Sequence, residues 1–235
     1  MFRFLLVTLL TLSLTDALLA GNLESKEEIL KKMVEAYGGE AALSNTQSYI
    51  QHWRVVRASD KKEGKETRRV TLPTRLYVDL KYPDKEETRV LEDSVGIKIF
   101  GKHSKKQVFG PMLDAMKAQL LRLYTPLTLK DNHEKIKLSQ NGSYYILTLD
   151  KDGVESDYYV NQKNYHIEKT VGKLKMGNSV MEFVTLYKDF KRVGDTLFPT
   201  TEIKYAGGVN TATNTLIDTK IVHLKKVDDH RYERI

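Results

Sequence analysis

The sequence contains six histidines, the side chains that most often bind metals or transfer protons near neutral pH. They are His52, His103, His133, His166, His223 and His230. None is spaced from another histidine or from a carboxylate as in the H-E-x-x-H zinc motif. The 235-residue chain also lacks cysteine, which excludes thiolate catalysis, disulfides and cysteine metal ligands. We interpret the histidines as isolated surface or strand residues, and we predict that the protein holds no metal and no cofactor.

The sequence motifs of the common nucleophilic and phosphate-binding enzymes are also missing. There is no G-x-S-x-G elbow, P-loop, G-x-G-x-x-G loop or EF-hand loop. The acidic pairs Glu86-Glu87 and Asp228-Asp229 are adjacent in sequence, so on a strand their carboxylates point to opposite faces and cannot flank one substrate bond. Carboxylates brought together from distant strands remain an open alternative. We predict that the protein is not an enzyme.

The formal net charge of +7 could attract nucleic acid, anionic lipid or acidic proteins. The positive residues are scattered in short pairs such as Lys61-Lys62, Arg68-Arg69 and Lys105-Lys106, and no basic helix carries interleaved aromatic residues. We interpret them as a solvated basic surface and predict no nucleic-acid partner.

The first residues have the pattern of a secretory signal. Arg3 precedes an apolar run of eleven residues, Phe4 to Leu14, which is shorter than the roughly 20 residues that span a bilayer. Small residues follow, ending at Ala20 and Gly21. This pattern predicts a cleaved signal peptide over residues 1–21, with an uncleaved membrane anchor as the alternative. The stretch LLAGN resembles a lipobox, but Asn22 stands where a cysteine would carry lipid, so no anchor of that type can form.

The segment that follows has the pattern of an amphipathic helix. Ser25 and Glu28 have the spacing of a capping box, and Gly38-Gly39 is a typical helix end. One face of this helix carries Ile29, Leu30, Met33, Val34 and Tyr37. A second short helical piece is predicted at 40–43.

From Tyr49 onward apolar residues alternate with polar ones, as in half-buried strands. Leu76, Val78 and Leu80 show this period. On a later strand Leu197, Ile203 and Tyr205 oppose Thr200, Glu202 and Lys204, which places Glu202 on the polar side. Asn141-Gly142 and Asp152-Gly153 are hairpin signals. We predict about ten antiparallel strands that form a sandwich or barrel. No linker or composition break interrupts them, so residues 22–235 are predicted to form a single domain, a monomer in solution.

One insertion, GPMLDAMKAQLLRLYTPLTL at 110–129, breaks the strand pattern. Pro111 suits a helix start and Pro126 a helix end. One helical face would carry Met112, Leu113, Met116, Leu120, Leu123 and Tyr124. The only large apolar surface that could cover this face is the concave side of the sheet.

Three stretches resemble the LolA/LolB-like proteins, periplasmic proteins similar to those that sort outer-membrane lipoproteins. They are ILKKMVEAYGGEAAL at 29–43, YKDFKRVGDTLFPTTEIKY at 187–205 and VDDHRYERI at 227–235. The resemblance implies a mainly β (α+β) fold, a half-open antiparallel β-barrel with an N-terminal helix and an inserted lid helix. It also implies that Met112, Leu113, Met116, Leu120 and Leu123 contact an apolar ligand. The alternative is that this helical face completes a packed core with no cavity.

The chain departs from the family at two positions. LolB-like members are lipid-anchored, which Asn22 does not permit. LolA-like carriers place a lid-locking arginine on an early strand; Arg54, beside Trp53, is the nearest match, and Arg57 is an alternative. Trp53 and Arg54 are therefore also predicted to be ligand-binding residues. The sequence thus predicts a periplasmic carrier of lipid, lipoprotein acyl chains or another apolar ligand, with envelope membrane proteins as further candidate partners. An envelope sensor or protein-interaction module with the same fold is the competing hypothesis.

Overall fold

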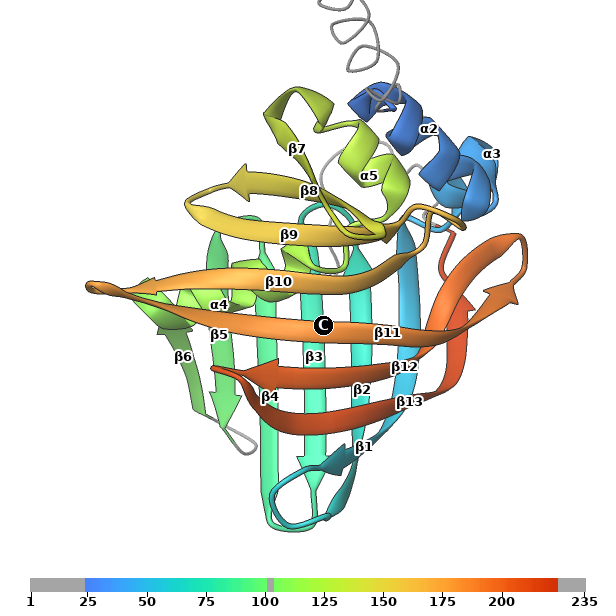
Figure 1. Ribbon diagram of the computed structural model, residues 1–235. Helices are drawn as coiled ribbons and strands as arrows, with labels where there is room; N and C mark the ends of the chain where they lie inside the picture. Colours follow the sequence, from blue (N-terminus) through green and yellow to red (C-terminus); the bar gives the residue numbers. More distant parts are fainter. Residues whose placement is uncertain (1–23, 101–103, 224–235) are drawn as a thin grey trace, which may run out of the picture.

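The structure is a computed structural model that describes residues 24–100 and 104–223 (Figure 1). The predicted signal peptide at 1–21 lies outside the described residues, as do His103, His230 and the stretch 227–235 that contributed to the resemblance.

Two short helices open the described chain, α2 (Lys26–Ala36) and α3 (Gly39–Asn45). The predicted cap is present: the Glu28 N–H donates a hydrogen bond of 3.1 Å to Ser25 Oγ. The apolar face of α2 is buried, with Ile29 and Met33 fully enclosed. The capping box and the helical apolar period therefore predicted this element correctly.

A single antiparallel sheet makes up most of the molecule. Among the described residues it has thirteen strands, in the order β6-β5-β4-β3-β2-β1-β13-β12-β11-β10-β9-β8-β7. Their bounds are β1 Ser48–Arg57, β2 Glu63–Thr71, β3 Arg75–Tyr82, β4 Lys85–Glu92, β5 Val95–Phe100, β6 Ser104–Val108, β7 Ile136–Asn141, β8 Tyr144–Lys151, β9 Val154–Asn161, β10 Ile167–Met176, β11 Ser179–Val193, β12 Thr196–Ala206 and β13 Val209–Ile221.

The prediction of about ten strands was too low because the edge strands lack an apolar alternation. Residues 104–107 of β6 are all exposed, and β7 is exposed after Ile136. Strands of this kind pair with their neighbour through backbone hydrogen bonds but contribute no buried face to the core. The predicted hairpins at Asn141-Gly142 and Asp152-Gly153 are present between β7, β8 and β9.

The sheet is open, because its edge strands β6 and β7 are not paired with each other. It folds back on itself, and Figure 1 shows β1 to β5 passing behind β10 to β13 with their directions crossing. An open antiparallel sheet is therefore confirmed. The connection from β6 to β7 carries α4 (Gly110–Leu121), α5 (Pro126–Lys130) and the short helix η1 (His133–Lys135).

Helix α4 lies inside the curved sheet. It contacts β9 and β10 on one side and β4 and β5 on the other. Pro111 stands in its first turn, as predicted. The helix ends at Leu121, earlier than predicted, because Thr125 caps a new helix: the Thr128 N–H donates to Thr125 Oγ1 over 3.3 Å.

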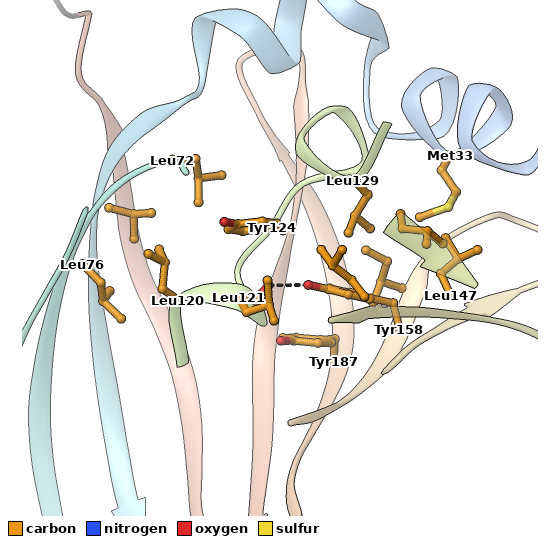
Figure 2. Close-up of a cluster of buried hydrophobic side chains, with 14 of the residues drawn as sticks. Met33, Leu72, Leu76, Leu120, Leu121, Tyr124, Leu129, Leu147, Tyr158 and Tyr187 are labelled. Atoms are coloured by element: carbon orange, nitrogen blue, oxygen red, sulfur yellow. Dashed lines mark hydrogen bonds between the residues drawn. The ribbon is translucent and has the colours of Figure 1, made fainter. Parts of the chain in front are cut away.

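Tyrosines hold the carboxyl end of α4 in the core. The Tyr158 hydroxyl donates a hydrogen bond of 2.6 Å to the Leu121 carbonyl (Figure 2), and the Tyr187 hydroxyl donates to the Arg122 carbonyl over 3.1 Å. The last carbonyls of a helix have no partner within the helix, so these bonds satisfy them. Leu121, Leu129 and Tyr158 then pack together in the main hydrophobic core.

Candidate ligand-binding cavity

The helices fill only part of the concave surface. Between the two halves of the sheet and one side of α4 lies an open cavity of about 450 Å³, within the range of small-molecule sites. It extends toward the turns that join β1 to β2 and β3 to β4, at the lower end of Figure 1. Its apolar walls include Val55, Leu80, Ala115, Leu123, Phe183 and Ala212. Its charged lining residues are Arg57, Glu66, Arg68, Lys85, Arg89, Arg122, Glu202 and Lys204.

A buried charge cluster forms part of the cavity wall. Arg68 on β2 donates to Glu202 on β12 through both terminal nitrogens, each over 2.9 Å, and its Nε donates to Glu66 over 3.0 Å. Two parallel bonds of this kind are the strongest arrangement between a guanidinium and a carboxylate. Lys204 Nζ lies 3.3 Å from Glu202 and 3.5 Å from Glu66. The Arg68 guanidinium also lies over the Trp53 ring, 5.1 Å from its centre.

The neighbouring cations keep both carboxylates ionised. Burial raises the pKa of Glu202, but Arg68 and Lys204 outweigh it and bring this pKa down to about 2. Burial acts on Glu66 in the same way, and Lys204 and Arg68 lower its pKa too. With two cations and two anions, the cluster is neutral overall.

Sequence reasoning missed this cluster. Glu202 was assigned to the polar side of its strand, yet it is 2% exposed and faces the concave surface. Glu66 and Arg68 alternate with the same period as Val70, which is buried, so all three share one face. This period was the available signal: it places two charges on a face that must enter the core.

Arg122 follows the last residue of α4 and lines the same cavity. Its Nε donates to the Ala118 carbonyl over 3.2 Å, and its Nη1 donates to the Phe183 carbonyl over 3.3 Å. Within 24–100 and 104–223, no carboxylate forms an ion pair with it. Burial lowers the pKa of Arg122 overall; the charges of Tyr187 and Glu202 raise it in part, and those of Arg68 and Arg89 lower it. Arginine nevertheless stays protonated, so a positive charge that belongs to no ion pair of the described residues faces the cavity.

A second excess of positive charge lies on β4 and β5. Glu87 is shared by three cations: Lys85 at 3.2 Å, Arg89 at 3.3 Å and Lys98 at 3.4 Å. Burial raises the pKa of Glu87, and these cations lower it overall. One carboxylate cannot balance three cations, so this side of the cavity is positive.

The structure separates the predicted site residues. Leu123 lines the cavity. Trp53 lies beside a smaller adjoining space of about 70 Å³, which Arg68 and Arg122 also border. Met116 and Leu120 are buried in the main core, and Leu113 packs against it. Met112 is 48% exposed.

The two predicted lid-locking arginines lie apart from α4. Arg54 is exposed and pairs with Glu63 over 3.3 Å. Arg57 lines the cavity, but its side chain is held by Asp84 at 2.7 Å and Asp60 at 3.3 Å, near the turns. The arginine that joins α4 to the sheet is Arg122, which no early-strand pattern could identify.

Two properties of the described residues bear on other functions. No group of three or more histidines, aspartates or glutamates could hold a metal ion in this part of the chain. Within the same residues, no helix has both the length and the apolar character needed to cross a membrane.

Comparison with solved structures identifies the fold. A LolA superfamily protein from Nitrosomonas europaea superposes with a TM-score of 0.56 and 13% identity, covering 86% of this chain and 96% of that one. A putative outer membrane lipoprotein-sorting protein domain from Vibrio parahaemolyticus gives 0.52 and 8%, covering 85% and 94%. A DUF1329 family protein from Desulfovibrio piger gives 0.50 and 9%, covering 85% and 93%. Neither a protein-family model nor a curated protein matches the sequence. The chain therefore has the LolA-like fold that its sequence predicted, while identities this low carry no activity across.

Proposed function

We propose that the protein is a carrier that binds a lipid, a lipoprotein acyl chain or another amphiphilic ligand in the cavity. The observation that carries this proposal is the open space of about 450 Å³ on the concave side of a LolA-like sheet. A protein interior is normally close-packed, so a cavity of this size with an open end requires an explanation. Binding a ligand is the explanation that the fold supports best.

The compartment is part of the same proposal. We propose export to the periplasm, removal of residues 1–21, a single domain over residues 22–235, and no lipid anchor because Asn22 replaces the cysteine of a lipobox. The neighbour from Vibrio parahaemolyticus is described as outer membrane lipoprotein-sorting, which supports lipoprotein acyl chains and envelope membrane proteins as candidate partners.

Helix α4 is proposed to adjust to the ligand. In the structure Leu123 and Ala115 face the cavity, whereas Met116 and Leu120 pack into the core. Contact of a ligand with Met112, Leu113, Met116 and Leu120 therefore requires α4 to shift away from β4 and β5. That these residues meet the ligand stays a prediction, and Leu123 is the member of the set best placed to do so.

The first test is chemical. The mature protein, purified without detergent, should yield lipid when its organic extract is analysed by mass spectrometry. It should also bind a fluorescent fatty acid.

A cavity-filling variant makes the test specific. Ala115→Trp should reduce binding of the fluorescent fatty acid strongly, because the indole would occupy the cavity. Ile217→Trp, at a position of β13 that is 61% exposed and does not line the cavity, should bind normally. If the wild-type protein contains no lipid and binds no fatty acid, the carrier proposal fails and the envelope sensor or interaction module replaces it.

A further inference from the structure

The charges that line the cavity do not cancel. The buried cluster of Arg68, Lys204, Glu66 and Glu202 is neutral. Arg57 is balanced by aspartates near the turns. What remains is Arg122, which forms no ion pair among the described residues, together with Lys85 and Arg89, which line the cavity and share Glu87 with Lys98. Even if the whole charge of Glu87 is set against Lys85, Arg89 and Arg122, an excess of two positive charges remains at the cavity.

The two arginines of this excess have donors to offer. All the hydrogen bonds of the Arg122 guanidinium go to two carbonyls and, over 3.4 Å, to the Thr185 hydroxyl. Arg89 Nε is buried, and although it lies 3.3 Å from Glu87 Oε1, the two atoms do not have the geometry of a hydrogen bond. A buried donor without an acceptor is unfavourable, and an anion in the cavity would remove that cost.

The two arginines approach the cavity from different elements, Arg89 from β4 and Arg122 from the end of α4. Planar guanidinium groups are suited to carboxylate and phosphate, which they bind through two parallel hydrogen bonds. The remaining walls, including Val55, Leu80 and Phe183, are apolar and match a hydrocarbon chain. The cavity therefore offers a positively charged surface for the head group of an amphiphile and an apolar surface for its hydrocarbon chain.

We infer that the ligand is an anionic amphiphile whose phosphate or carboxylate head group is bound by Arg122 and Arg89, with its chain along the apolar walls. This inference rests on the proposed carrier function and names its ligand class. A cationic ligand does not fit, because Glu66 and Glu202 are already engaged by Arg68 and Lys204. Arg122 also lies at the carboxyl end of α4, so the bound head group would contact both the helix and the sheet.

The test compares ligands that share a chain and differ in head group. Isothermal titration calorimetry of delipidated wild-type protein should show tight binding of lauroyl lysophosphatidate and laurate. Lauroyl lysophosphatidylcholine, whose head group is neutral overall, should bind at least about 10-fold more weakly, since a hydrogen bond to a charged group contributes roughly 1.5–3 kcal/mol. Inorganic phosphate alone should bind far more weakly than lysophosphatidate, because it lacks the chain.

Variants then assign the head-group site. Arg122→Gln and Arg89→Gln should each weaken lysophosphatidate binding by about 10- to 100-fold and leave lysophosphatidylcholine unchanged. Arg122→Lys should give an intermediate loss of affinity, since lysine keeps the positive charge but lacks the planar guanidinium that forms two parallel hydrogen bonds. Arg69→Gln is the matched control, because Arg69 is exposed on the opposite face of β2, over the Tyr77 ring. Thermal melting of each variant would show that it is folded.

The outcomes separate the two proposals. Equal binding of the anionic and neutral lipids, or equal losses in Arg122→Gln and Arg69→Gln, would overturn the anionic inference and leave the carrier function standing. Phosphate binding as tight as that of lysophosphatidate would overturn the role of the chain. If none of the lipids binds the wild-type protein, both proposals fall together.

Discussion

The concave surface of the sheet has two halves that are built differently. Toward α2 and α5 it is packed with apolar side chains, among them Met33, Leu121, Leu129 and Tyr158 (Figure 2). Toward the turns that follow β1 and β3 it encloses the cavity and carries the charged residues. Helix α4 is the boundary, since Met116 and Leu120 enter the core while Ala115 and Arg122 face the cavity. One end of the sheet is thus packed as a core, and the other end is open and carries the proposed binding site.

Two arginines show the same contrast at the level of single residues. Arg68 has two carboxylate partners and is 2% exposed, whereas Arg122 has carbonyl and hydroxyl partners only. A fully paired buried charge specifies how β2 meets β12. A buried charge that belongs to no ion pair contributes little to the stability of the free protein, and the proposed anionic ligand would supply the partner that Arg122 lacks.

The largest effect is expected from Leu120→Asp. Leu120 is 5% exposed in the main core, so the variant would bury an unpaired carboxylate. We expect loss of the folded state, seen as loss of the near-UV circular dichroism signal and of a cooperative melt. Met112→Asp, on the exposed turn of the same helix, should melt like the wild type.

The outcome decides between two descriptions of α4. A folded Leu120→Asp protein that melts cooperatively would show that α4 detaches easily, as a lid drawn from the low-stability part of a structure would. In that case α4 would contribute less to the packed half of the concave surface than the structure indicates.

The second effect is expected from Arg68→Met. Removing one partner of a buried ion pair typically costs about 3–5 kcal/mol, because the remaining charge is left uncompensated. Glu66 and Glu202 would keep Lys204 as their ion-pair partner, 3.3 Å or more from either carboxylate, and Glu202 would keep a hydrogen bond of 3.5 Å from Asn214. The free energy of unfolding from urea denaturation should fall by that amount. Arg122→Met should change it by about 1 kcal/mol or less, and similar losses in both variants would contradict the contrast between the two arginines.

The sequence predicted the periodic elements and the fold well. The capping box at Ser25, the hairpin glycines and Pro111 are local signals, and each marks the element that the structure contains. Local signals act over a few residues, so one sequence carries them in full. The edge strands were missed because an exposed strand has no buried face to create a pattern.

The cavity could not be predicted in the same way. Arg68 and Glu202 are 134 residues apart, and nothing in either strand identifies its partner. The alternation on β12 gave the correct period, but it does not say which face is concave, so Glu202 was placed toward solvent. The apolar stripe of α4 was recognised, whereas the side that faces the cavity carries Ala115, Gln119 and Arg122, residues typical of a solvated helix face. In the sequence, residues that line a polar cavity show the same pattern as residues on the outer surface of the protein.

The third effect is a loss of stability in acid. The pKa of Glu202 falls from 4.5 to about 2 in the folded state, so its ionised form stabilises the fold. This contribution is complete above about pH 4.5 and disappears as the pH falls toward 2; the lowered pKa of Glu66 acts in the same direction. Urea denaturation should therefore show a midpoint that drops over this window. In Arg68→Met the drop should begin at higher pH, and an unshifted profile would mean that Arg68 does not hold these carboxylates ionised.

A smaller effect is expected where α4 packs against β5. A methyl group on Gly96 would lie 2.7 Å from Val108 Cγ2 and 2.9 Å from Leu113 Cδ1, so the neighbours would have to move. Gly96→Ala should reduce the free energy of unfolding by about 1–3 kcal/mol, the usual cost of overpacking. A melting temperature equal to that of the wild type would show that this side of α4 is loosely packed.

The smallest effect is expected on the other wall, at Gly172 of β10. A methyl group there would lie 3.4 Å from Ala118 Cβ and 3.4 Å from Arg122 Cδ, which is an ordinary contact. Because alanine loses less backbone entropy than glycine in a strand, Gly172→Ala should leave the melting temperature unchanged or raise it by the equivalent of about 0.5–1 kcal/mol.

Lysophosphatidate titration of the same variant tests the position of the Arg122 side chain. The added methyl group would limit the movement of Arg122 without removing a hydrogen-bond donor. The affinity should therefore stay within about 3-fold of the wild type, a difference of less than 1 kcal/mol. A large loss of affinity with an unchanged melting temperature would mean that Arg122 must swing away from β10 to reach the head group, and that the cavity binds its ligand in an arrangement different from the one in the free protein.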